Sequence, residues 1–164
     1  MADGTGAEVV NCQSEMSEEN QPNGRRQAEA APSLQRFFKN DQFAARADIE
    51  LLTLSPGQAR AKMTLHPYHL NGYGTVQGGA IFTLADFAFA AASNSHGTIA
   101  VAINVNITFM KATKTGTLWA EAKEMSRNFK LGSYTVEVKD DHGELVALFQ
   151  GLAYRKSEKI GAAS

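Results

Sequence analysis

The sequence predicts an α+β domain in which a curved antiparallel sheet wraps around one long, apolar helix. Residues 78–94, "GGAIFTLADFAFAAASN", are almost wholly apolar, so a helix formed there needs cover on nearly every side. After residue 98 the hydrophobic period becomes two, which is typical of strands. The strand-like runs follow one another without intervening helices, so antiparallel pairing is expected.

The other elements are expected in the following order. Pro32 and Ser33 indicate a helix start before "LQRFFKND". Alternating residues around a Pro-Gly turn predict a hairpin with strands at about 47–54 and 58–65. A glycine-rich loop, "YHLNGYGTVQGG", leads into the long helix. The runs after the helix predict a four-strand meander: "IAVAINVNITFMKAT", "TLWAEAKEMSRNF", "SYTVEVKDD" and "LVALFQGLAYRK".

Composition divides the chain into three parts. Residues 1–32 contain no aromatic side chain and are rich in Gly, Asn, Gln, Glu and Ala, which predicts a disordered or loosely ordered tail. The folded domain is expected at residues 33–157, and residues 158–164 are expected to form a short C-terminal tail.

Charge and composition exclude several classes of function. The formal net charge is -1, so there is no global basic field to hold nucleic acid or an anionic membrane. No apolar run reaches the length of a membrane span, and the N-terminus does not read as a secretory signal, so a cytoplasmic protein is expected. The single cysteine, Cys12, excludes an internal disulfide framework, and the histidines show no metal-binding spacing.

One carboxylate, Asp86, lies in the middle of the apolar helix. None of its helical neighbours three and four positions away can pair with a charge: Phe82, Thr83, Phe89 and Ala90. Burying an unpaired carboxylate costs several kcal/mol or drives it to take up a proton. Asp86 is therefore either held by hydrogen bonds from a neighbouring loop or subunit, or it acts as a general base or nucleophile.

Two glycines, Gly78 and Gly79, stand at the helix start, where free N–H groups and the helix dipole favour a negative oxygen. They leave those donors open to a carbonyl that becomes negative during acyl transfer, or they only allow the loop to turn into a closely packed helix. Asp86 lies eight residues further on, roughly 12 Å along the axis. If both positions are catalytic, they come from two chains packed antiparallel in a dimer.

The run "HLNGYGTVQGGAIFTLADFAFAAASN", followed by "INVNITFMKAT", resembles the hotdog-fold acyl-CoA thioesterases of the PaaI type, in the phenylacetate-degradation group. The resemblance covers about residues 35–156. It implies that Asp86 is the catalytic base or nucleophile, and that Gly78 N–H and Asn71 hold the thioester carbonyl. It also implies that Asp and Gly come from opposite subunits of a homodimer, commonly assembled into a homotetramer as a dimer of dimers. No cofactor is implied beyond the coenzyme A within the substrate.

Gln77 departs from the family pattern, which usually reads His-Gly-Gly at this point. The glycines are retained, so the N–H donor is expected to survive. A glutamine can neither become a cation nor take up a proton at neutral pH. If the usual histidine only braces the loop, Gln77 can replace it; if the histidine contributes charge, activity or substrate choice differs.

Further residues are expected to contact the substrate or support its site. Besides Gln77 and Gly79, they are His69, Tyr73, Thr83, Asn104, Arg127 and Lys130. Thr83 lies one turn before Asp86 and either hydrogen-bonds it or bonds back to the helix backbone. Arg127 and Lys130 flank a turn and, like Lys111 and Lys114 on another loop, suit the phosphates of coenzyme A. For each of these side chains an ordinary structural or solvated role is the alternative.

The sequence thus predicts a metal-independent thioesterase that hydrolyses an aryl-, short- or medium-chain acyl-CoA to a free acid and coenzyme A. The alternative is a non-catalytic acyl-CoA-binding or regulatory hotdog module, against which the presence of Asp86 argues. A hydratase on the same fold would pair an Asp with a His, and no His lies near Asp86 in the sequence. The absence of a GxSxG elbow disfavours a serine hydrolase.

Overall fold

The computed structural model describes residues 32–160 of the chain. The tail expected at residues 1–32 lies outside this range except for Pro32, and so do residues 161–164. The elements are α1 (Pro32–Lys39), α2 (Gln42–Arg46), β1 (Ile49–Ser55), β2 (Gln58–Thr64), the 3-10 turn η1 (Pro67–His69), α3 (Gly78–Asn94), β3 (Thr98–Phe109), β4 (Thr117–Arg127), β5 (Leu131–Lys139) and β6 (Leu145–Lys159).

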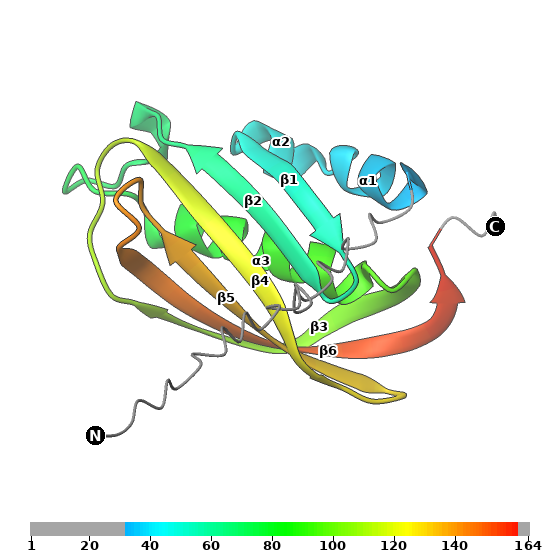
Figure 1. The fold of residues 1–164 in the computed structure, drawn as a ribbon. Coiled ribbons are helices and arrows are strands. Elements are labelled where there is room, and N and C mark those ends of the chain that lie inside the picture. Colours follow the sequence, from blue (N-terminus) through cyan, green and yellow to red (C-terminus); the bar gives the residue numbers. More distant parts are fainter. Residues whose placement is uncertain (1–31, 161–164) are drawn as a thin grey trace, which may run out of the picture.

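The six strands form one antiparallel sheet in the order β1-β2-β4-β5-β6-β3. The sheet curves around α3, which packs against every strand (Figure 1). The two short helices lie beside β1 at one edge of the sheet, and α2 also contacts α3. This arrangement confirms the predicted α+β architecture. No helix within residues 32–160 is both long and apolar enough to cross a membrane.

The predicted four-strand meander is wrong at its first strand. β3 pairs with β6, whereas β4 pairs with β2, so of these four strands only β4, β5 and β6 form a meander. Residues 110–116 therefore lead the chain around one end of the sheet (Figure 1). A hydrophobic period of two indicates which face of a strand is buried, but it contains no information about which neighbour the strand pairs with.

The helix expected over "LQRFFKND" is α1, which ends at Lys39, and a second short helix that was not expected follows it. The Asp41 carboxylate accepts hydrogen bonds from Phe43 N (3.0 Å) and Ala44 N (2.9 Å), which caps a new helix, α2, instead of extending α1. The rings of Phe38 on α1 and Phe87 on α3 meet edge to face at 6.0 Å. At the other end of the chain, β6 continues to Lys159, past the expected domain end at residue 157.

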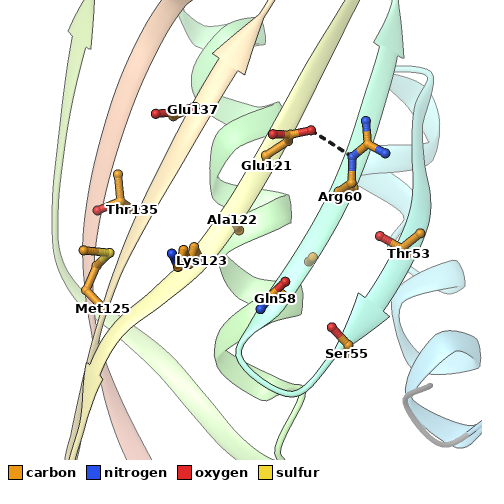
Figure 2. A pocket seen from close by; sticks show the side chains of 11 residues that line it. Thr53, Ser55, Gln58, Arg60, Glu121, Ala122, Lys123, Met125, Thr135 and Glu137 are labelled. Carbon is orange, nitrogen blue, oxygen red and sulfur yellow. Dashed lines mark ion pairs between the residues drawn. The ribbon is translucent and has the colours of Figure 1, made fainter. Parts of the chain in front are cut away.

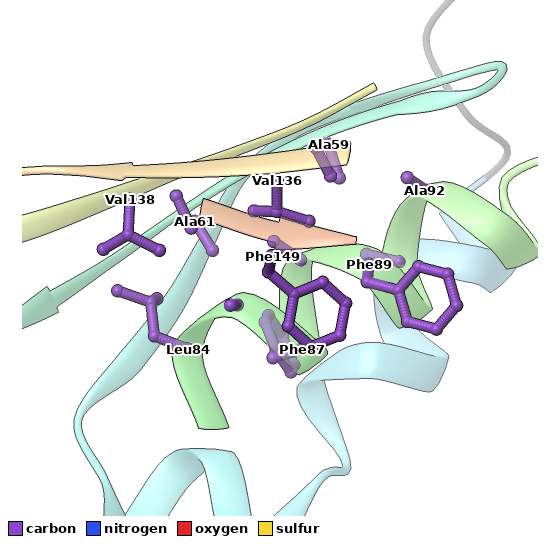
Figure 3. Close-up of a cluster of buried hydrophobic side chains, with 14 of the residues drawn as sticks. Ala59, Ala61, Leu84, Phe87, Phe89, Ala92, Val136, Val138 and Phe149 are labelled. Carbon is purple, nitrogen blue, oxygen red and sulfur yellow. The ribbon is translucent and has the colours of Figure 1, made fainter. Parts of the chain in front are cut away.

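The core lies between α3 and the concave face of the sheet (Figure 3). Leu84 and Phe89 of α3 are buried against Val136, Val138 and Phe149 of the sheet. Each such side chain contributes roughly 1.5–3 kcal/mol by its removal from water. This packing fixes the rotation of α3, and therefore fixes which of its residues remain accessible.

Candidate functional site

The loop before α3 is closed by the side chain of Asn71. Its Oδ1 accepts hydrogen bonds from Tyr73 N (2.9 Å) and Thr75 N (3.3 Å), and its Nδ2 donates to Thr75 Oγ1 (3.0 Å). Tyr73 stands at the tip of the loop and is 91% exposed. One hydrogen of Nδ2 is used within the loop, and the other has no acceptor in the described part of the chain.

His69 lies at the base of this loop and is only 5% exposed. Its Nδ1 accepts a hydrogen bond from His66 N (3.1 Å), which leaves the proton of the neutral ring on Nε2. Within residues 32–160, that Nε2 has no hydrogen-bond partner. The His69 carbonyl accepts from Gln77 N (2.8 Å), so the residue ties the base of the loop to the start of α3.

The first N–H groups of a helix have no acceptor inside the helix, and in α3 they can be followed one by one. Gln77 N–H donates to the His69 carbonyl. The Gln77 side-chain oxygen accepts from Gly79 N–H and, at 3.2 Å, from Ala80 N–H, which also donates to the Gln77 backbone carbonyl (2.9 Å). Gly78 N–H has no acceptor in the described part of the chain. One donor, that of Gly78, is therefore left over at this end of the helix.

The two glycines have different close neighbours. A Cβ on Gly79 would lie 2.5 Å from the Gln77 side-chain oxygen, so the Gln77 cap requires a glycine there. A Cβ on Gly78 would lie 3.1 Å from Cζ of Phe109, whose ring stands beside this first turn. Phe109, on β3, is half-exposed and was not recognised in the sequence as part of this region.

Asp86 is partly buried on α3, two turns beyond the glycines. Burial raises the pKa of its carboxyl group, and the nearby charge of Asp41 raises it further. No hydrogen bond from residues 32–160 contributes to this pKa. Asp86 is thus not held by a loop of the described chain, and its carboxylate is available to a substrate or a second subunit.

Thr83 does not bond to Asp86. Its Oγ1 donates to the Gly79 carbonyl (2.8 Å), the backbone alternative considered above. Positions 79, 83 and 86 share one face of α3, because they are spaced by four and three residues. The first part of this face borders a hollow between α2, η1 and α3, lined by Phe43, Arg46, Ala47, Tyr68, His69, Gln77, Gly79, Ala80 and Thr83.

Strand β3 forms a free edge of the sheet. Asn104 is exposed on this strand, next to an irregularity in its pairing with β6. Large apolar side chains are also exposed along or just after it: Val101, Ile103, Phe109 and Met110. An exposed apolar edge strand is a surface to which a second chain can add.

Arg127 and Lys130 lie at the opposite end of α3 from Gly78. Arg127 Nε pairs with Glu124 Oε1 (3.2 Å), and Glu124 in turn meets His96, just past the helix end (2.7 Å). Lys130 Nζ lies over the ring of Tyr154 (5.5 Å). Because 17 residues of helix span roughly 25 Å, neither cation reaches Gly78 of its own chain.

A broader hollow lies on the outer face of the sheet (Figure 2). Its lining is polar and includes an ion pair between Arg60 Nε and Glu121 Oε1 (3.0 Å). The sheet separates this hollow from α3, and so from Asp86 and Gly78. We therefore locate the candidate site along α3, not on this outer face.

Comparison with known proteins identifies the family. The family model described as the Thioesterase superfamily matches residues 73–147. A relative from Archaeoglobus fulgidus is 45% identical over 123 residues, which is 74% of this chain and 80% of the relative. The acyl-coenzyme A thioesterase PaaI of Escherichia coli is 36% identical over 126 residues, or 76% of this chain and 87% of that protein. This chain belongs to the thioesterase superfamily.

Solved structures agree with this assignment. The structure of the Escherichia coli PaaI protein superposes with a TM-score of 0.75 at 34% sequence identity, covering 77% of this thioesterase and 93% of that chain. The TT0310 protein of Thermus thermophilus superposes with a TM-score of 0.68 at 36% identity, covering 71% of this chain and 99% of that one. The predicted resemblance to PaaI-type hotdog thioesterases is confirmed, and so is the class of thioester hydrolase.

Proposed function

We propose that this thioesterase hydrolyses an acyl-CoA to the free acid and coenzyme A in a homodimer that joins Gly78 of one subunit to Asp86 of the other. The observation that carries the proposal is the pair of unsatisfied groups on α3. Gly78 N–H has no acceptor in the described chain, and the Asp86 carboxylate has no donor. The name of the Escherichia coli PaaI relative supports acyl-CoA as the substrate class.

Geometry supports the assignment to two subunits. The two groups are separated by eight residues of continuous helix, roughly 12 Å, whereas a base must lie within about 3 Å of its target. Two copies that pair along the free β3 edges, with their α3 helices antiparallel, would bring the groups together. The exposed apolar side chains of β3, Ile103 at 54% and Phe109 at 51%, support this edge as the interface.

The reaction follows from the chemistry of the two groups. Gly78 N–H donates to the thioester carbonyl and stabilises the negative charge that develops on its oxygen. Asp86 takes a proton from the attacking water, or attacks the carbonyl carbon directly to form a mixed anhydride, which water then hydrolyses to the free acid and the Asp86 carboxylate. In both routes the carbon–sulfur bond breaks, and the thiolate leaves as coenzyme A after protonation. Burial favours this role, because a raised pKa makes the Asp86 carboxylate a stronger base.

Basic side chains from both subunits are expected to bind the phosphates of coenzyme A. Lys114 is exposed on the loop whose Thr113 carbonyl accepts from Val76 N (2.8 Å), at the same end of α3 as Gly78. In an antiparallel dimer, Arg127 and Lys130 of the second copy approach this end. We further propose a dimer of dimers and a cytoplasmic location, which light scattering and cell fractionation test.

The test is thiol release, followed with a thiol-reactive dye, across aryl-acetyl, short-, medium- and long-chain acyl-CoA substrates. Asp86→Asn should abolish most turnover while the protein stays folded by circular dichroism. Glu137→Gln, which removes a carboxylate on the outer face of the sheet, is the matched control and should behave as wild type. Unchanged turnover in Asp86→Asn contradicts the proposal. Acyl-CoA binding without any thiol release by wild type would favour the non-catalytic module.

A further inference from the structure

We propose that Gln77 is a positioning residue, whose side-chain oxygen occupies Gly79 N–H, the other donor of the first turn without a backbone acceptor, and so leaves Gly78 N–H as the one donor presented to the thioester. The inference rests on the proposed function and extends it. The family histidine is absent at this position, so the question is what a neutral amide does there.

The cap is held in place from two sides. Gln77 N–H donates to the His69 carbonyl (2.8 Å), and the preceding Val76 N–H donates to the Thr113 carbonyl (2.8 Å). The backbone that supports the Gln77 side chain is thus fixed to the loop before α3 and to the β3–β4 connection. The missing side chain of Gly79 then gives the amide oxygen room to reach the first turn.

A second observation shows that this end of α3 is built to receive a ligand. His69 lines the same hollow as Gln77, Gly79 and Ala80. It is 5% exposed, and its Nε2 has no hydrogen-bond partner in the described chain. A buried donor without a partner is costly, so its place beside the capped turn indicates that an acceptor group from outside the described chain approaches there.

The neutrality of the cap has a chemical consequence. Without the cap, Gly79 N–H would be a second open donor beside Gly78 N–H, and the thioester carbonyl could bind in two registers, of which only one places the carbon opposite the base. A carboxylate at position 77 would accept the same two N–H groups, but its charge would oppose the negative charge that develops on the carbonyl oxygen. An amide oxygen closes the unwanted donor without that repulsion.

The experiment compares Gln77→Met, which has similar length but no acceptor, with Gln77→Glu, which keeps the acceptor and adds charge. With the best acyl-CoA of the panel, Gln77→Met should lower kcat at least about tenfold and change KM by less than about twofold, because it disturbs placement more than binding. Gln77→Glu should keep the protection of Gly79 but be poorly active throughout the pH range in which Asp86 is ionised. The pKa of Asp86 is raised, so a falling pH neutralises this base before it neutralises a carboxylate that accepts helix N–H groups. Gln58→Met and Gln58→Glu, on the outer face of the sheet, are the matched controls.

A second measurement tests the cap without turnover. In the wild-type protein without ligand, amide hydrogen exchange should be slow at Gly79 and Ala80 and fast at Gly78, and Gln77→Met should remove the protection at Gly79. Equal exchange at all three amides overturns the inference, as does a Gln77→Met variant with wild-type kcat. If the wild-type protein hydrolyses no acyl-CoA, both the proposed function and the positioning role of Gln77 are wrong. If the wild-type protein is active and the Gln77 variants are equally active, only the positioning role is wrong.

Discussion

Gly151 on β6 lies against the ring of Phe89. Phe89 is on α3, three residues after Asp86. A Cβ at position 151 would lie 2.7 Å from Phe89 Cε2 and 2.9 Å from both Cδ2 and Cζ. Carbon atoms pack at about 3.5–4.0 Å, so the ring would have to retreat by roughly 1 Å. It is enclosed by the rings of Tyr134, with centroids 5.5 Å apart, and Phe149, at 5.6 Å, so it has no free space to enter.

We therefore expect Gly151→Ala to destabilise the protein. Overpacking of this kind costs about 1–3 kcal/mol, while replacing a glycine of ordinary backbone conformation by alanine returns about 0.4–1 kcal/mol. The net loss is about 1–2 kcal/mol, which lowers Tm by roughly 3–10 °C for a domain of this size. Thermal unfolding followed by circular dichroism, at one fixed protein concentration, measures it.

A double variant isolates the cause. In a Phe89→Leu background the ring is gone, so Gly151→Ala should be neutral or stabilising there. The coupling between the two substitutions should exceed about 0.5 kcal/mol. A rise in Tm for Gly151→Ala alone, or the same loss in both backgrounds, would refute the reasoning.

Three further predictions concern charge and assembly. Asp41→Asn keeps a good helix cap but removes the charge that raises the pKa of Asp86, so the acid limb of the kcat/KM pH profile should move to lower pH. Burial alone would raise the pKa of Glu124, but hydrogen bonds, first from Tyr134, lower this pKa overall. The ionised Glu124 therefore stabilises the folded protein, and this stabilisation is lost as the pH falls through the lowered pKa. Urea titrations should show this loss in the wild-type protein and not in Glu124→Gln. Ile103→Asp, on the free β3 edge, should give folded monomers in sedimentation experiments and abolish turnover.

The sequence predicts the helix and its surroundings well because the relevant signals are local. The apolar run at residues 78–94 could form only a covered helix, and the strands follow from a period of two. The pairing of β3 with β6 cannot be predicted from local sequence patterns, because it joins residues such as Val101 and Tyr154 that lie far apart in the sequence.

The residues of the candidate site also fall into two groups, those with a local sequence signal and those without one. Asp86 and Gly78 stand out in the sequence because a carboxylate in an apolar helix and a glycine at a helix start are unusual there. Asp41 carries a local signal, a good cap residue directly before "QFAAR", that identifies the start of α2. The contact of Phe109 with Gly78 joins residues on different elements and has no sequence signal, so only the folded chain reveals it.

Because α3 is continuous, the distance and the angle about the helix axis between residues 78 and 86 are fixed. Each residue turns a helix by about 100°, so one residue inserted between them would move the Asp86 carboxylate from the accessible face to the buried position now held by Phe87. The loop at residues 71–76 and the connection at residues 110–116, which meet the start of the helix, lie outside this interval, so their length can vary without changing it. Changes of substrate size in proteins built on this plan should be sought in those two loops, while the spacing along the helix stays constant.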